Sequence, residues 1–88
     1  MFPHLRAVEH KHIRPFKEFG LAVKKLRGKN NLTQLALSDE CEIDIRTIQR
    51  IEAGEQNLTL AIILEIAKAL NVTPSQLLKN IQINPVQD

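Results

Sequence analysis

Apolar residues recur every three or four positions in residues 16–27, which is the spacing of one face of a helix. The apolar positions are Phe16, Phe19, Val23 and Leu26. We therefore expect an amphipathic helix here, with Pro15 in its first turn and lysines on the opposite side. Gly28 and the residues after it end the helix, and Asn31 is able to take the left-handed conformation.

Two short helices are expected next, separated by a tight turn. Thr33 is of the N-cap type and begins a helix that runs to about Glu40. Asp44 is a stronger N-cap type and begins a helix over residues 45–53. Gly54 offers a left-handed stop just beyond it.

Residues 45–53 divide into a buried side and an exposed side. At about 100° per residue, Ile48 and Ile51 fall together, and Ile43 packs beside them from the turn. The other side presents Ile45, Arg46, Gln49 and Arg50. Arginine and glutamine are the side chains that hydrogen-bond guanine and adenine edges in a major groove, although any solvated helix face can contain them. The preceding helix favours the DNA interpretation, because its positive end, with Gln34 exposed there, suits a phosphate.

Residues 60–70 are apolar at every position except Glu65 and Lys68. With Thr59 as the N-cap, we expect a helix that is buried on most sides. The residues that suffice for the core of one chain are Leu60, Ile63, Leu64, Ala67 and Leu70. Ile62 is then surplus to that core.

Thr73 is the N-cap of a last helix that starts at Pro74 and runs from Ser75 to about Lys79, and residues 80–88 form a short tail. The tail alternates polar residues with three apolar ones, namely Ile81, Ile83 and Val86. Apolar side chains in water need a surface to pack on, either their own domain or a second copy. We expect these three residues, together with Ile62, to form a dimer interface.

Composition narrows the fold class to all-α. Hydrophobic residues make up 43% of the chain, yet its aromatic residues are three phenylalanines, so the core must be aliphatic, as in a helical bundle. Eighty-eight residues allow one domain. The single Cys41 excludes an internal disulfide and no leader precedes the first helix, so we expect a reducing cytoplasm. No apolar run approaches the ~20 residues of a membrane span.

Charge is distributed unevenly along the chain. Residues 1–32 hold eight basic and two acidic residues, a net charge of +6, whereas the remainder holds four basic and eight acidic residues, a net charge of −4. The basic part suits a polyanion such as DNA. Within it, residues 1–15 are expected to form an arm that follows a DNA backbone, enters a minor groove, pairs with its copy in a dimer, or stays disordered.

Catalytic and cofactor-binding patterns are absent from the sequence. There is no Gly-rich phosphate loop, no nucleophile beside a base and no recognisable metal-ligand spacing. We therefore expect no enzyme, no cofactor and no metal site.

The central segment resembles the phage repressor and Cro type (XRE-like) helix-turn-helix family. The matching positions are Leu32-Thr33-Gln34, Leu37, Ile43, Ile48, Arg50-Ile51-Glu52 and Gly54, followed in register by Ala67-Lys68-Ala69-Leu70 and Val72. The resemblance covers about residues 21–78, with the helix-turn-helix motif at residues 33–53. A match sustained over several elements is far more specific than a bare helix-turn-helix pattern.

The resemblance implies a compact five-helix, lambda-repressor-like domain over residues 16–79. Its expected function is a homodimeric, sequence-specific transcription regulator, a repressor or autoregulator, that binds double-stranded DNA with the helix 45–53. The implied phosphate contacts are Lys29, Thr33 and Gln34, and the implied base contacts are Ile45, Arg46, Gln49 and Arg50, with Asp44 beside them. Arg27 and Glu52 are the implied structural pair, clamping the first helix to the recognition helix.

Several residues depart from the family pattern and favour an alternative. Glu42 stands where the turn usually has Gly, which costs about 1 kcal/mol if the residue is left-handed. Ser38 replaces a usual Ala, and Glu55 stands where members often place a basic residue against phosphate. Asp44 adds a negative charge near the DNA. Because phosphate contacts dominate DNA affinity, the alternative is a protein-interaction module of the antitoxin or adaptor type.

Overall fold

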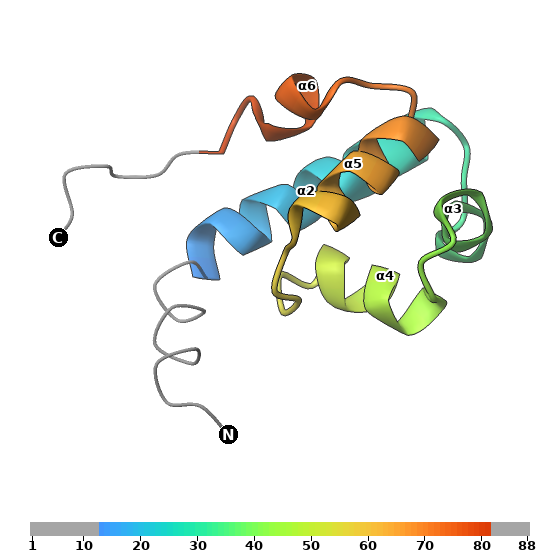
Figure 1. Ribbon diagram of the computed structural model, residues 1–88, viewed down its shortest axis with the longest axis horizontal. Coiled ribbons are helices and arrows are strands. Elements are labelled where there is room, and N and C mark those ends of the chain that lie inside the picture. Colours follow the sequence, from blue (N-terminus) through green and yellow to red (C-terminus); the bar gives the residue numbers. More distant parts are fainter. Residues whose placement is uncertain (1–12, 82–88) are drawn as a thin grey trace, which may run out of the picture.

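The structure, a computed structural model, describes residues 13–81 as a bundle of helices without a strand in that range. The helices are α2 (Ile13–Lys29), α3 (Gln34–Cys41), α4 (Ile45–Glu52), α5 (Leu60–Ala69) and α6 (Pro74–Leu78), as Figure 1 shows. The predicted all-α, five-helix fold is confirmed. The N-terminal arm, the tail, and with them Ile83 and Val86, lie largely outside the described residues.

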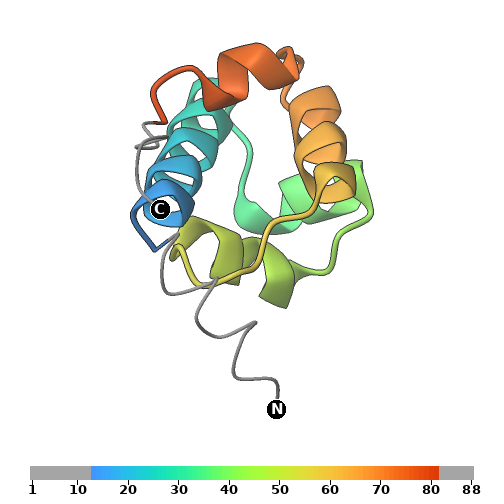
Figure 2. The same cartoon turned by 60° about the vertical axis from the view of Figure 1, so that its left-hand side comes forward.

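The helices surround one core (Figure 2). Helix α2 packs against α4 and α6, while α3 packs against α4 and α5. The buried apolar residues are Phe19, Val23, Leu37, Cys41, Ile48, Ile51, Ile66, Ala67, Leu70 and Leu77. In both views α4 lies at the opposite edge of the bundle from α6, so its outer face meets solvent.

Helix α2 begins earlier than the sequence indicated. Its first residue is Ile13, so the boundary predicted after residue 15 falls inside the helix, with Pro15 in the first turn as expected. Arg14 and Glu18, one turn apart, form an ion pair at 3.4 Å. A helix can start at Ile13 because proline is tolerated in a first turn, where its missing N–H has no intrahelical acceptor.

The four predicted N-caps are present. They are Thr33, Asp44, Thr59 and Thr73, and each side chain accepts a hydrogen bond from the backbone N–H three residues on. Asn31 and Glu42 both have φ of 56°, and Gly54 has φ of 75°. The expected left-handed residues therefore occur where the helices end.

The predicted buried face of α5 is confirmed for Ala67 and Leu70, which are buried, and for Ile63, which packs against the core. It is wrong for Leu60, which is 70% exposed, and for Leu64, which is 46% exposed, and it omits the fully buried Ile66. Ile62 and Ile81 are half-buried and pack against the core, so neither is surplus to it. The contacts of α5 with α3 and α6 set its rotation, and a helix that is apolar nearly all round offers no polar side to oppose that choice.

Candidate DNA-binding surface

Helix α4 is held close against α2 at a glycine that the sequence reading missed. A Cβ at Gly20 would lie 2.8 Å from the Glu52 carbonyl oxygen and closer still to that of Ile51. Both contacts are shorter than real Cβ atoms show, so the helices approach this closely because position 20 has no side chain. Because its own Ile48 and Ile51 side chains are buried in the core, α4 is packed firmly against the rest of the domain.

The outer face of α4 presents the predicted base-contacting residues together. Arg46, Gln49 and Arg50 are exposed and Ile45 is half-buried at the first turn. Within residues 13–81, the three polar side chains make no hydrogen bond. The two guanidinium groups and the amide are therefore free to hydrogen-bond to another molecule.

Asp44 stands at the N-terminus of α4 with both carboxylate oxygens in use. Its Oδ1 accepts from the Thr47 backbone N–H at 2.9 Å and its Oδ2 accepts from the Thr47 hydroxyl at 3.0 Å. These hydrogen bonds lower the pKa of Asp44 below its usual value, so the carboxylate is ionised at neutral pH. Sequence reasoning found the cap but missed the second bond of Thr47, whose hydroxyl three residues after an N-cap aspartate was the available signal.

The N-terminus of α3 offers unpaired backbone donors. The Thr33 hydroxyl accepts from the Ala36 N–H at 3.0 Å, and the Thr33 carbonyl accepts from the Leu37 N–H at 3.0 Å. The N–H groups of Gln34 and Leu35, at the helix start, have no intrahelical acceptor. Such an end attracts anions, and Lys29 lies exposed in the last turn of α2, shortly before it in the chain.

Arg27 and Glu52 form a nearly buried pair that joins α2 to α4. Arg27 donates from Nε to Glu52 Oε2 at 2.7 Å and from Nη2 to Oε1 at 3.0 Å, and its Nη1 donates to the Leu32 carbonyl at 2.9 Å. The Glu52 side chain is 5% exposed. The hydrogen bond with Glu52 raises the pKa of Arg27, against the opposing effect of burial. The pair is charged and hydrogen-bonded.

Gln34 differs from its prediction as an exposed phosphate ligand. It is half-buried, and its Nε2 donates to Glu52 Oε1 at 3.0 Å. The side chain thus points back into the domain, because a buried carboxylate with spare lone pairs is a better acceptor than water. Its backbone N–H, at the start of α3, still has no intrahelical acceptor.

The turn between α3 and α4 satisfies its own polar groups. The Ser38 hydroxyl donates to the Ile43 carbonyl at 2.6 Å, which gives the extra hydroxyl at this position a structural role. The Cys41 thiol donates to the Leu37 carbonyl at 3.0 Å, and burial raises the pKa of this free cysteine. The strained Glu42 therefore sits in a well-supported turn.

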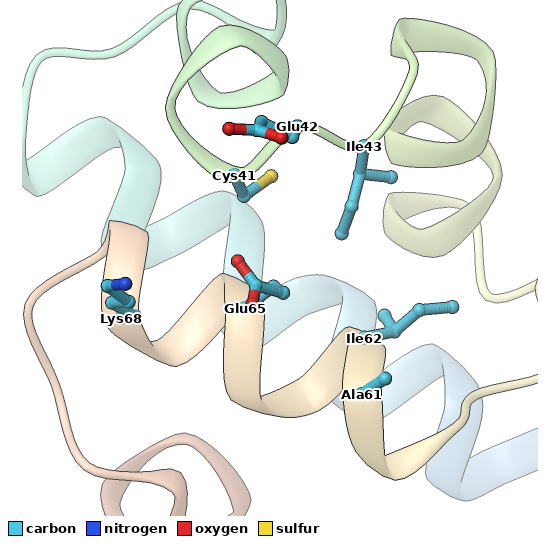
Figure 3. A pocket seen from close by; sticks show the side chains of 7 residues that line it. All are labelled: Cys41, Glu42, Ile43, Ala61, Ile62, Glu65 and Lys68. Carbon is cyan, nitrogen blue, oxygen red and sulfur yellow. The ribbon is translucent and has the colours of Figure 1, made fainter.

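An open pocket of about 460 Å³ lies between this turn and α5 (Figure 3). Its lining residues are Cys41, Glu42, Ile43, Ala61, Ile62, Glu65 and Lys68. The apolar side chains come from both walls, and the charged ones are exposed. Among residues 13–81 no group of three or more potential metal ligands is gathered, here or elsewhere.

No helix in the described range is both long enough and apolar enough to cross a membrane.

Comparison with known proteins gives consistent relatives. The control protein C.BamHI of Bacillus amyloliquefaciens is 41% identical over 61 residues, which are 68% of this chain and 75% of that protein. The crystal structure of the restriction-modification controller protein C.AhdI from Aeromonas hydrophila has a TM-score of 0.69 at 31% identity, covering 70% of this chain and 94% of C.AhdI. The competence regulator ComR from Streptococcus vestibularis, in its apo form, has a TM-score of 0.70 at 30% identity, covering 80% of this chain but 24% of ComR.

The family model of helix-turn-helix domains matches residues 23–77, which is more than half of the chain. This range agrees with the resemblance found over residues 21–78. The chain belongs to the helix-turn-helix family and is a DNA-binding transcription regulator.

Proposed function

We propose that this chain is a homodimeric regulator that recognises its operator by placing α4 in the major groove. The observation that supports this most directly is the outer face of α4, where Arg46, Gln49 and Arg50 stand exposed and unbonded on a helix held by its buried side. Such a face matches the width of a major groove and the chemistry of base edges.

The roles of the side chains follow from their donors and acceptors. Arg46 and Arg50 hydrogen-bond to guanine, Gln49 hydrogen-bonds to adenine, and Ile45 contacts a thymine methyl group. Asp44 either repels a nearby phosphate or accepts a hydrogen bond from a cytosine amino group. Its two bonds to Thr47 leave lone pairs for such a contact, because a carboxylate has about four acceptor sites.

Phosphate contacts hold the domain on the duplex. The free N–H groups at the start of α3, the Thr33 hydroxyl and the Lys29 ammonium are the donors we assign to this role. The side chain of Gln34 is assigned a smaller share, because one of its amide hydrogens is bonded to Glu52.

The second copy is proposed to pack on the outer face of α5. Leu60 and Leu64 are two exposed leucines one turn apart, whereas Ile62, the residue predicted for this interface, lies on the opposite side of the helix and packs against the core. Because Ile81 already packs against the core of its own chain, the tail residues that we retain for the dimer interface are Ile83 and Val86. A two-fold dimer places its two α4 helices on half-sites about one helical turn, ~34 Å, apart.

The relatives suggest which genes are regulated. C.BamHI is a control protein and C.AhdI is a restriction-modification controller protein. We propose that this chain likewise controls restriction-modification genes, as a repressor or autoregulator. A regulator of this kind acts beside the chromosome, so we place it in the cytoplasm.

Selection of bound duplexes from a random DNA pool, followed by a salt titration, tests the proposal. We expect a selected duplex to bind at least about 10³-fold more tightly than a scrambled one, and its affinity to fall steeply between 50 and 200 mM salt, roughly in proportion to the phosphates contacted. Failure to bind any duplex at low salt would contradict it and favour the interaction module of the antitoxin or adaptor type.

A further inference from the structure

The two helices of the motif are tied together at both ends. The turn joins the C-terminus of α3 to the N-terminus of α4. At the opposite ends, Gln34 is the first residue of α3 and Glu52 is the last residue of α4, and the Gln34 amide donates to the Glu52 carboxylate at 3.0 Å. The hydrogen bond therefore joins the two helix ends that the turn does not connect.

The Glu52 end of this bond is fixed independently of Gln34. Two hydrogen bonds from Arg27 orient the carboxylate, and its side chain is 5% exposed. Glu52 also lies where α2 passes close to α4, at Gly20. Gln34 thus bonds to an anchor that α2 holds against the end of the recognition helix.

Without this bond, α3 would be held to α4 by the turn and by packing. The far end of an eight-residue helix lies about 12 Å from its other end, so a small rotation at the turn displaces it appreciably. That far end carries the N–H groups of Gln34 and Leu35 assigned to phosphate. Recognition sites need their groups held within about 0.5 Å.

We propose that Gln34 is a positioning residue for operator recognition. Through Glu52 it sets the location of the phosphate-facing end of α3 relative to the base-facing side of α4. The phosphate anchor then determines the depth and register of α4 in the groove. This inference rests on the proposed function, and it assigns Gln34 an action through the protein instead of through its own contact with DNA.

A double-mutant cycle distinguishes an action of Gln34 through Glu52 from a direct contact of Gln34 with DNA. Gln34→Met keeps the length of the side chain and removes its hydrogen-bonding groups. We expect operator affinity to fall about tenfold, while affinity for a random duplex changes by less than about twofold. The reason is that register matters for base contacts, whereas nonspecific binding tolerates a shifted anchor.

The control variant lacks the Arg27–Glu52 pair to which Gln34 is hydrogen-bonded. Replacing Arg27 and Glu52 together by methionine exchanges a nearly buried ion pair for apolar groups, a change that is often tolerated. There, Gln34→Met should alter operator affinity by less than about twofold, because its partner is gone. An equal loss in both backgrounds, or an equal loss for operator and random duplex, would show that Gln34 acts directly on DNA and would overturn the proposal.

A spectroscopic readout covers the case in which the methionine pair does not fold. In the unaltered chain, the side-chain amide of Gln34 should show slowed hydrogen exchange by NMR, both free and bound to the operator. Release of the amide on DNA binding would overturn the positioning role. A chain that binds no duplex contradicts the proposed function and this inference with it, whereas binding with an additive cycle contradicts this inference alone.

Discussion

Helices α4 and α5 have similar lengths and opposite patterns. In α4, Ile48 and Ile51 form a narrow apolar side and every other residue except Ile45 is polar or charged, so one orientation alone buries both Ile48 and Ile51. In α5, polar residues stand at two positions, and the helix buries Ile66 while exposing Leu60. Clear segregation of polar and apolar residues sets the rotation of a helix, whereas near-uniform hydrophobicity leaves the rotation to its neighbours.

Because their exposed residues differ, the two helices suit different kinds of binding partner. The exposed face of α4 carries cationic forks and an amide, which are chemically matched to base edges. The exposed face of α5 carries Leu60 and Leu64, which are matched to another apolar surface, and the exposed Glu65 and Lys68 border them. One small domain thus presents a polar face and an apolar face on different helices.

We expect the largest effect on stability from a substitution that disturbs the packing of α4 against α2. Gly20→Ala places a Cβ against the carbonyl oxygens of Ile51 and Glu52, which belong to backbone that cannot move aside cheaply. We expect a loss of about 3 kcal/mol in the free energy of unfolding, measured by urea denaturation. The matched control is Gly28→Ala, where a Cβ meets nothing within 4 Å, and it should gain up to about 1 kcal/mol. Similar losses in both variants would show that α2 and α4 are not in close contact.

A second large effect is expected on the apolar face of α5. The double variant Leu60→Lys, Leu64→Lys should raise the dimer dissociation constant about 100-fold, because buried lysines are costly at an interface. Sedimentation velocity at tens of micromolar measures this change. The control is Leu21→Lys on α2, where a leucine is 63% exposed. Equal weakening by the control, or a monomeric unaltered chain at that concentration, would contradict the α5 interface.

The polar face of α4 predicts a change in specificity. Arg50→Ala should lower operator affinity by about 1–3 kcal/mol and relax preference at one base pair. Fluorescence anisotropy with a panel of single-base operator variants measures both. Lys79→Ala, an exposed cation at the end of α6, is the control for lost charge. A loss that is equal for every sequence would show that Arg50 contacts phosphate alone.

The smallest effect is expected at Asp44, where capping and charge are separable. Serine also caps helices but carries no charge, so Asp44→Ser should leave thermal stability at pH 7 nearly unchanged. If the carboxylate repels phosphate, DNA binding should tighten, most strongly at low salt where screening is least. Unchanged or weaker binding at low salt would instead favour contact with a cytosine amino group.

Asp44 also predicts a pH dependence of stability. Because its pKa in the folded chain lies below the usual 3.8, the ionised cap stabilises the fold above that value, and this contribution is lost as the pH falls through the lowered pKa. Thermal melts of the unaltered chain and of Asp44→Ser should therefore agree near neutral pH. Below about pH 3.8 the unaltered chain should lose more stability than the serine variant.

Local features of this fold were predictable because their partners are close in sequence. The N-caps at Thr33 and Asp44 bond three residues ahead, so the residue type and the pattern after it suffice. The left-handed conformation of Glu42 was indicated by the family resemblance, since Gly usually stands at this position of the turn. The exposed arc of α4 followed from the positions of its two buried isoleucines, Ile48 and Ile51.

Other features depend on residues far apart in the chain, and tertiary structure alone decided them. Gly20 is needed because α2 crosses the end of α4, a contact that no local pattern encodes. Gln34 turns inward because folding brings Glu52, 18 residues away, within hydrogen-bond distance. The leucines of α5 face outward because α3 and α6 contact its other side. A sequence states which residues prefer burial or a hydrogen bond, but when several qualify, the packing of distant elements selects among them.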